Sequence, residues 1–425
     1  MSAVTKVHAA GAHAERGCEL PLRDHVAQAQ ALGTHYAFTV AITGRGVSRR
    51  YTLIVRHPES PAMRVPLPLL LALLPLPALA AAQLDRLVLP PGFHVALYSD
   101  QVAGARELAL GANGTVFVGS TGAGKVYALT DTHGDGVADR VRVIASGLQQ
   151  PMGVAFHDGD LYVSAVSRIL VLRDIEQHLD DPPAPQLITD KLPRETAHGG
   201  RFIAFGPDGR LYVPIGAPCN ICAPGPEHAK LIRMHADGSG WQDVARGIRN
   251  SVGFDWQPGS GRLWFTDNGR DLMGDDTPSD ELNEITGAGE HFGYPYCHQG
   301  DTLDPGFGAG HRCRDYVPPV LKLGAHVAPL GMRFYRGRQF PASYRGAILV
   351  AEHGSWNRSG KSGYRVMVVR VDGSKVRSYQ PLLTGFEQNE RAWGRPADVQ
   401  PLPDGSVLVS DDLAGAVYRI TYRKP

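Results

Sequence analysis

Short runs of alternating apolar and polar residues recur along the chain, each followed by a tight-turn signal and a second apolar run. Two examples are "VAFHDGDLYVSAV" from Val154 and "FIAFGPDGRLYVPIGA" from Phe202. The turns read HDGD, PDGR, PGSG and PDGS, and their glycine, aspartate and proline residues favour turn conformations. A period of two residues predicts β-strands rather than helices. The chain is therefore expected to consist of antiparallel β units.

This unit occurs six times. Its second strands centre on Phe117, Tyr162, Tyr212, Trp264, Leu349 and Leu408. Most of the intervals are about 45–60 residues, the length of a four-stranded propeller blade. The longer step from Trp264 to Leu349 requires an insertion, expected around residues 271–330. We predict an all-β fold, a single six-bladed β-propeller over residues 83–425; a β-sandwich does not explain a repeat of this length.

The segment before the repeats has a different character. Residues 63–82, "MRVPLPLLLALLPLPALAAA", have the basic start, the apolar run and the small residues of a secretory signal peptide. An uncleaved membrane anchor is the alternative, but the run is short and contains four prolines. Residues 1–62 show no clear strand or helix period. We expect them to be a disordered upstream extension, with translation beginning at Met63 and the mature protein periplasmic or secreted.

Four cysteines follow this leader, an even number that suits disulfides in an oxidising compartment. Three pairings are possible, and proximity in sequence favours Cys219–Cys222 and Cys297–Cys313. The alternative for "CNIC" is a zinc or haem site, but Ala223 stands where haem attachment requires histidine. The charge is nearly balanced, with 43 basic and 42 acidic residues, which argues against a nucleic-acid binder.

Residues that directly precede the repeated strands should face a common opening. The first strands of propeller blades line a central channel, and the loops at one end form its mouth. His198, Arg249, Asn250, His353 and Arg395 are in such places. Two glycines after His198 allow the sharp turn that would direct its imidazole toward the mouth.

From Leu89 to Tyr422 the chain resembles the pyrroloquinoline quinone (PQQ)-dependent soluble sugar dehydrogenases, most closely the L-sorbosone dehydrogenase and aldose sugar dehydrogenase branch. The resemblance depends on "HGGRFIAFGPDGRLYVPIGAPCNIC", "GIRNSVGFDWQP", "LWFTDNGRD", "FGYPYC" and "GRPADVQPLPDGSVLVSDD". It implies a quinoprotein that oxidises an aldose or a related aldehyde, such as sorbosone, by hydride transfer to PQQ. Electrons would then pass to an external cytochrome or quinone, because the chain has no haem motif.

The same resemblance assigns roles to the mouth residues. It implies that His198 is the general base and that Arg249 faces both the substrate oxygen and the quinone. It also implies that Asn250 and Arg395 contact PQQ. In this chain His353 stands where a PQQ-binding lysine is expected.

Other positions match the family less closely. Gln149 is expected near the cofactor, although Gln150 beside it leaves the register open. Ala217 and Ala397 replace an acidic residue and a second arginine of the glucose enzymes, which indicates a different substrate or a differently held cofactor.

Calcium is the second cofactor that the resemblance implies. Its ligands would be main-chain carbonyls of Gly269 and Arg270, and calcium prefers such oxygen ligands. The alternative is a solvated acidic loop without an ion. Residues 131–139, "DTHGDGVAD", resemble the start of an EF-hand loop, but His133 and Arg142 stand where oxygen ligands belong, so a plain blade turn is expected.

Two other functions remain open from the sequence. A calcium-dependent propeller lactonase would use acidic and amide side chains such as Asn250 and Asp398, which leaves His198 and the arginines without a role. A non-catalytic binding propeller is the other alternative, because one fold supports many functions.

Overall fold

The computed structural model describes residues 26–32, 35–44, 47–56 and 82–425 and divides into two units, Met1–Leu76 and Pro77–Pro425. In the first unit, β1 (Val26–Leu32), β2 (His35–Gly44) and β3 (Val47–Arg56) form an antiparallel sheet. This sheet lies within the segment that was expected to be disordered. The expected signal peptide lies outside the described residues except for Ala82, and so does Cys18.

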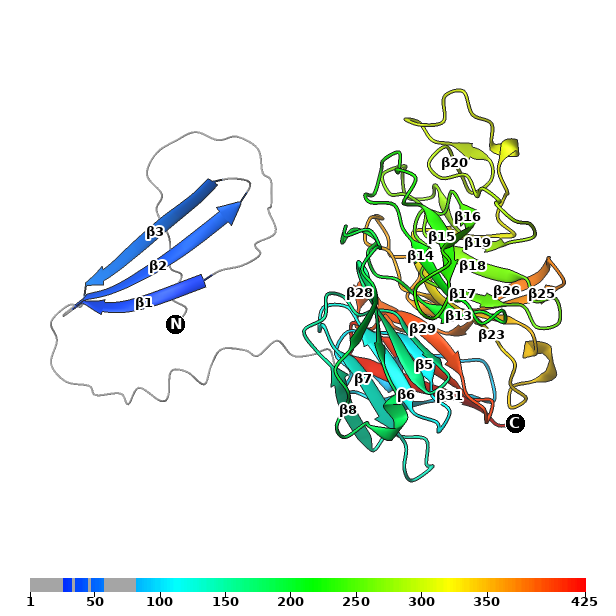
Figure 1. Ribbon diagram of the computed structural model, residues 1–425, viewed down its shortest axis with the longest axis horizontal. Helices are drawn as coiled ribbons and strands as arrows, with labels where there is room; N and C mark the ends of the chain where they lie inside the picture. The colour runs from blue at the N-terminus through cyan, green and yellow to red at the C-terminus, as the bar shows by residue number, and fades with distance from the viewer. Residues whose placement is uncertain (1–25, 33–34, 45–46, 57–81) are drawn as a thin grey trace. The chain divides into compact units, whose positions relative to one another are not determined.

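The second unit is a six-bladed β-propeller, as predicted (Figure 1). Each blade is a four-stranded antiparallel sheet. The first three blades are β5 (Ala105–Leu110), β6 (Val116–Ser120), β7 (Val126–Thr130), β8 (Arg140–Ala145); β9 (Val154–His157), β10 (Asp160–Ala165), β11 (Arg168–Leu172), β12 (Gln186–Thr189); and β13 (Ala204–Phe205), β14 (Leu211–Ile215), β15 (Lys230–Met234), β16 (Gln242–Arg246).

The last three blades follow the same order from the innermost strand outward. They are β17 (Phe254–Trp256), β18 (Leu263–Asp267), β19 (Ser279–Glu284), β22 (Leu321–Ala325); β23 (Pro329–Phe334), β24 (Ile348–Glu352), β25 (Arg365–Asp372), β26 (Lys375–Leu383); and β29 (Pro396–Pro401), β30 (Val407–Asp411), β31 (Ala416–Tyr422), β4 (Phe93–Ser99). The helical elements of the propeller unit are short 3-10 turns, and no helix of the described residues is long and apolar enough to cross a membrane.

All six residues on which the repeat was centred lie in the second strand of a blade. These strands are buried on both faces, since blades stack against one another; every residue of β6, β14, β18, β24 and β30 is buried. The innermost strands contact one another around the ring, β29 with both β23 and β5 and β5 with β9. The N-terminal residues of these strands therefore meet at one end of the channel.

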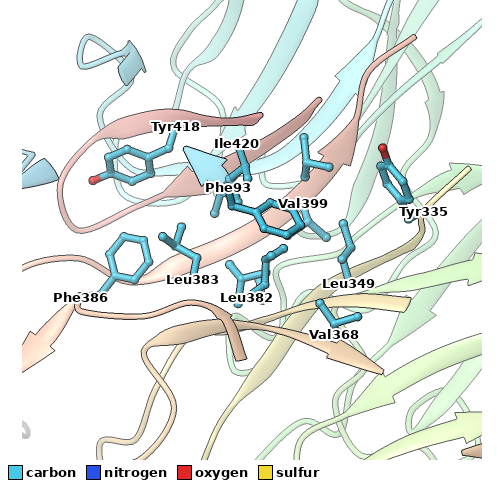
Figure 2. Close-up of a cluster of buried hydrophobic side chains, with 14 of the residues drawn as sticks. Phe93, Tyr335, Leu349, Val368, Leu382, Leu383, Phe386, Val399, Tyr418 and Ile420 are labelled. Carbon is cyan, nitrogen blue, oxygen red and sulfur yellow. The ribbon is translucent and has the colours of Figure 1, made fainter. Parts of the chain in front are cut away.

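The ring closes by pairing the two ends of the propeller chain. The strand β4 is the outer strand of the last blade and pairs antiparallel with β31, with Phe93 opposite Tyr422. Phe93 packs edge-on against Phe340 at 4.8 Å between ring centroids, and it contacts the rings of Tyr344 and Tyr422. Figure 2 shows Phe93 among the buried residues that β24, β25, β26 and β31 contribute to this cluster.

The region of the expected insertion contains two blade strands, β19 and β22. Additional chain lies before β19 and between β19 and β22, where β20 (Cys297–His298) and β21 (Thr302–Leu303) form a small hairpin that projects beyond the blades (Figure 1). The disulfide Cys297–Cys313 closes this segment, and the second disulfide is Cys219–Cys222. Both favoured pairings are confirmed.

The closure predicts a large stability loss from one substitution on β4. Phe93→Ala removes a buried ring from the cluster that joins the two chain ends, so the free energy of unfolding should fall by about 3–5 kcal/mol. Urea unfolding followed by far-UV circular dichroism measures the change. His94→Ala, at the exposed neighbouring position of the same strand, is the matched control and should change the free energy by less than about 0.5 kcal/mol. Equal effects of the two substitutions would contradict a closure that depends on this ring.

Candidate active site

A pocket of about 330 Å³ opens where the segments preceding β13, β17, β23 and β29 meet. Seven of the predicted site residues line it. They are His198, Arg249, Asn250, Gly269, Arg270, His353 and Arg395. Gln149 is exposed and does not line the pocket, so its contact with a cofactor stays a prediction.

His198 is held in a left-handed backbone conformation, with φ of 48°. Its Nδ1 lies 2.8 Å from the carbonyl oxygen of Ala217, so in the neutral ring Nδ1–H donates and Nε2 keeps the lone pair. A side chain at Gly216 would lie 2.6 Å from the His198 Cβ, so glycine is required there. Burial, followed by the charge of Arg249, lowers the pKa of His198 to about 4. The imidazole is therefore a neutral acceptor near pH 7.

Arg249 is only 4% exposed, and fixed acceptors surround its guanidinium. Its Nε donates to the Asn220 carbonyl at 3.2 Å and its Nη2 to the Asn220 Oδ1 at 2.7 Å. Its Nη1 donates to the Asn268 carbonyl at 3.0 Å. Burial lowers the pKa of Arg249, but a guanidinium remains charged in proteins. Three of its five N–H groups hold it in place, and the other two can serve a ligand.

The buried carboxylate of Asp267 fixes the backbone that carries Arg249 and Asn250. It ends β18 and accepts hydrogen bonds from both main-chain nitrogens, at 2.9 Å from Arg249 and 2.6 Å from Asn250. Burial raises the pKa of Asp267 to about 6, while these hydrogen bonds favour the charged form. The sequence alone did not reveal this role, and Asp267 stood out only as one of several acidic residues. Its backbone partners lie 17 and 18 positions earlier in the chain, so no local pattern connects them.

The main-chain carbonyls of His353 and Gly354 hold the Arg395 side chain. Arg395 donates from Nε to the His353 carbonyl at 3.0 Å and from Nη2 to the Gly354 carbonyl, and its guanidinium lies over the Tyr364 ring. The His353 Nε2 lies 2.8 Å from the carboxylate of Asp412. Burial lowers the pKa of His353 to about 4, although Asp412 opposes this shift. His353 is therefore neutral near pH 7 and does not supply the positive charge of a lysine.

Gly269 and Arg270, the predicted calcium ligands, line the pocket. The Arg270 guanidinium is directed elsewhere, with Nη1 at 2.7 Å from Asp304 and Nε at 3.1 Å from the Asp271 carbonyl. Within the described chain neither the Gly269 nor the Arg270 carbonyl accepts a hydrogen bond, so both oxygens are available to a cation. Among the described residues, no three His, Cys, Asp or Glu side chains are grouped to hold a metal ion.

The neighbouring acidic residues are solvated only in part, because Asp276 is exposed while other members of the set are buried. Asp280 and Glu281 are buried on β19, and burial raises their pKa to about 7 and about 8. Asp280 accepts hydrogen bonds from the Gly269 and Ala328 nitrogens, both at 2.7 Å. It therefore fixes the segment that carries the two candidate metal-binding carbonyls.

Asp398 is not among the residues that line the pocket. Met152, Val252, Leu330 and Ala397 form an apolar cluster, of which Leu330 also lines the pocket. Asp398 accepts a hydrogen bond from the Leu108 nitrogen and lies 3.4 Å from Arg333. The structure thus does not bring Asp398 into the pocket with Asn250, as a lactonase cage would require.

The Asp131–Asp139 loop lies apart from this pocket. The Asp131 carboxylate accepts hydrogen bonds from the nitrogens of Gly134, Asp135 and Gly136, and the Asp139 carboxylate lies 2.8 Å from His133. These contacts close the loop as a turn, and ion binding there stays untested.

Sequence reasoning missed several residues of the pocket and its surroundings. Asn268 and His326 line it, and Trp356 stands at its rim with 71% of its surface exposed. Asn220 reaches Arg249 from the loop between two cysteines. The motif "GSWNR" directly after an apolar strand could have indicated that Trp356 lies at the pocket. Nothing in the local sequence indicated a site role for Asn220.

Comparisons with known proteins agree with the fold and the resemblance. The family model described as glucose/sorbosone dehydrogenase matches residues 154–419. An uncharacterized protein of Borreliella burgdorferi is 34% identical over 353 residues, which cover 80% of this chain and 91% of the relative. A pyrroloquinoline quinone-dependent pyranose dehydrogenase of Coprinopsis cinerea is 34% identical over 124 residues, 24% of this chain and 16% of that protein.

Among solved structures, the holo form of the pyranose dehydrogenase PQQ domain from Coprinopsis cinerea is similar, with a TM-score of 0.68. The two chains are 20% identical, and the match covers 79% of this chain and 97% of the other. This likeness shows the propeller fold. The family match over most of the propeller shows the family as well as the fold. It confirms the resemblance found in the sequence: the chain belongs to the glucose/sorbosone dehydrogenase family.

Proposed function

We propose that this protein is a PQQ- and calcium-dependent dehydrogenase that oxidises an aldose or a related aldehyde, such as sorbosone. The observation that carries the proposal is one pocket that holds a neutral histidine beside two arginines, Arg249 and Arg395. A base and fixed cations are what the removal of a proton and a hydride from a hydroxyl-bearing carbon requires.

The residues of the pocket fit a polyanionic quinone. PQQ carries three carboxylates, and Arg249 and Arg395 offer charged donors that suit carboxylate and carbonyl oxygens. The pocket volume falls in the range of small-ligand sites. Gly269 and Arg270 would hold Ca²⁺ through their carbonyls, as a hard cation prefers. When bound, the quinone supplies the hydride acceptor and Ca²⁺ polarises its carbonyl.

The protein's own groups would act on the substrate hydroxyl. His198 would take the hydroxyl proton at Nε2, while Nδ1–H remains bonded to the Ala217 carbonyl and fixes the ring. Arg249 would direct its two remaining N–H groups at the substrate oxygen and stabilise the negative charge that develops there. Trp356 at the rim provides an exposed aromatic face for a sugar ring.

The setting of the reaction is part of the proposal. Two disulfides suit a periplasmic or secreted enzyme, and the leader at residues 63–82 supplies the export signal. Electrons would leave the reduced cofactor for an external cytochrome or quinone.

An activity assay tests the function directly. Purified apo-protein is loaded with PQQ and Ca²⁺, supplied with a panel of aldoses and sorbosone, and followed by reduction of a redox dye. Dye reduction that requires PQQ supports the proposal. Acid release from a lactone without PQQ would instead identify a lactonase, and neither reaction would point to a binding propeller.

The assigned base predicts the effect of His198→Asn. Asparagine tolerates the left-handed backbone of residue 198 better than alanine does, so the fold should be kept while the base is lost. We expect kcat to fall by about 10²–10⁴-fold, with PQQ still bound and the melting temperature unchanged. Turnover in the dye assay and the absorbance of bound PQQ measure the two effects, and unchanged turnover would remove His198 from its role.

The environment of His198 predicts an acid-resistant base. The pKa of about 4 lies below the ordinary 6.5, so the ring is neutral above about pH 4 and protonated below it. Base-dependent kcat/KM should therefore decrease as the pH falls through about 4 rather than 6.5. NMR titration of the imidazole in the cofactor-free protein checks the value, with His198→Asn assigning the resonance. A midpoint near 6.5 would show that the ring is not desolvated.

Arg395 is expected to bind the cofactor. Arg395→Ala removes a charged donor from the pocket, and charge-assisted hydrogen bonds contribute about 1.5–3 kcal/mol each. The dissociation constant for PQQ should rise by about 10–100-fold, measured by quenching of intrinsic tryptophan fluorescence in the presence of Ca²⁺. Arg391→Ala, an exposed arginine on β28 (Arg391–Ala392), is the matched control. If both variants bind PQQ equally well, Arg395 is not a cofactor ligand.

A further inference from the structure

The loop closed by Cys219 and Cys222 contacts the pocket arginine through a single residue. Asn220, between the two cysteines, accepts from the Arg249 Nη2 at its Oδ1 and from the Arg249 Nε at its carbonyl oxygen. Two of the three acceptors that hold this guanidinium thus come from one residue. The third is the Asn268 carbonyl on the other side.

The same asparagine is itself tied to the neighbouring blade. Its Oδ1 also accepts from the Asp271 nitrogen at 3.2 Å, and the Tyr294 hydroxyl donates to the Cys222 carbonyl at 3.0 Å. These contacts link the loop after β14 to the segments around β19. The loop has no strand or helix of its own between Ile215 and Lys230. The disulfide and these hydrogen bonds hold it in position, together with the hydrogen bond from the Ala217 nitrogen to the Arg249 carbonyl at 2.8 Å.

We propose that Asn220 is a positioning residue for Arg249 and that the Cys219–Cys222 disulfide holds it in place. This inference rests on the proposed function, in which Arg249 orients the substrate oxygen. The planar guanidinium can rotate about its side-chain bonds unless acceptors fix it. With Asn220 in place, the Nε–H and one N–H of Nη2 are occupied on the loop side, and the two N–H groups that remain unbonded can serve the substrate. Without it, Arg249 stays charged but loses this orientation.

The amide oxygen and the loop closure make separable contributions. Asn220→Ala removes the Oδ1 acceptor and leaves the main-chain carbonyl, whereas Cys219→Ser with Cys222→Ser frees the whole loop. Asn220→Asp keeps an acceptor at the same atom and should rescue function. Ile221→Ala changes the other residue between the same cysteines, whose side chain cannot accept a hydrogen bond, and is the matched control.

The first measurement needs no cofactor. Hydrogen exchange of the Arg249 Nη2–H groups, one of which donates to the Asn220 Oδ1, is followed by ¹H–¹⁵N NMR in the apo-protein, with Arg249→Lys identifying the signal. We expect exchange at least tenfold faster in Asn220→Ala and in the double serine variant, and unchanged in Asn220→Asp and Ile221→Ala. Unchanged exchange in both disrupted variants would overturn the proposal, whatever the enzyme's activity.

The second measurement uses the PQQ- and Ca²⁺-loaded enzyme. In Asn220→Ala, kcat/KM for the sugar should fall by roughly 10–100-fold, mainly through kcat, because displacement of a positioning group affects the transition state most. Asn220→Asp should restore kcat to within about threefold of the parent, since the acceptor at Oδ1 is retained. A fall of the same size in Asn220→Asp or Ile221→Ala would mean that the loop acts only through stability and would overturn the positioning role. A parent enzyme with protected Arg249 but no dye reduction would overturn only the proposed function.

Discussion

Buried hydrogen bonds between neighbouring blades hold the mouth of the channel in one geometry. The hydroxyl groups of Ser164, Thr266 and Ser410 lie on second strands. Each donates to a carbonyl in the inner strand of the following blade or just before it: Arg201, Leu330 and Arg106. Asn268 does the same with the Pro329 carbonyl. Four of the inner strands, β13, β17, β23 and β29, begin at the pocket, so contacts of this kind connect the fold to the site. An unmade hydrogen bond in such a buried place costs about 1–3 kcal/mol, which favours one register of the ring.

The fold could be predicted because its cause is repeated along the chain. Central blade strands are buried on both faces, so six apolar runs such as those around Tyr212 and Trp264 stand out at a regular spacing. Residues directly before the inner strands were also predictable as pocket residues, as His198 and Arg249 show. Position along a repeat is sufficient for both conclusions.

The supporting contacts of the site could not be predicted in this way. Asp267 and Asn220 act on Arg249 across 18 and 29 positions of sequence, and nothing in their local pattern specifies a partner. The charge of His353 depends on burial, which the residue type alone does not reveal. The family resemblance placed Gln149 near the cofactor, yet Gln149 is exposed and does not line the pocket. Tertiary contacts, rather than composition or spacing, determine these properties.

Desolvation explains how a base and cations coexist in one small pocket. Burial disfavours the charged form of every group, but its consequence depends on how far the ordinary pKa lies from neutrality. The pKa of His198 begins at 6.5, so the ring becomes neutral over the working range. The pKa of Arg249 begins far above neutrality, so the guanidinium stays charged although its pKa is also lowered. The charge of Arg249 further disfavours protonation of His198. The same burial therefore produces an uncharged proton acceptor beside a permanent cation. Solvent would weaken this combination, because it would screen the charge of Arg249 and return the pKa of the His198 ring toward its ordinary value.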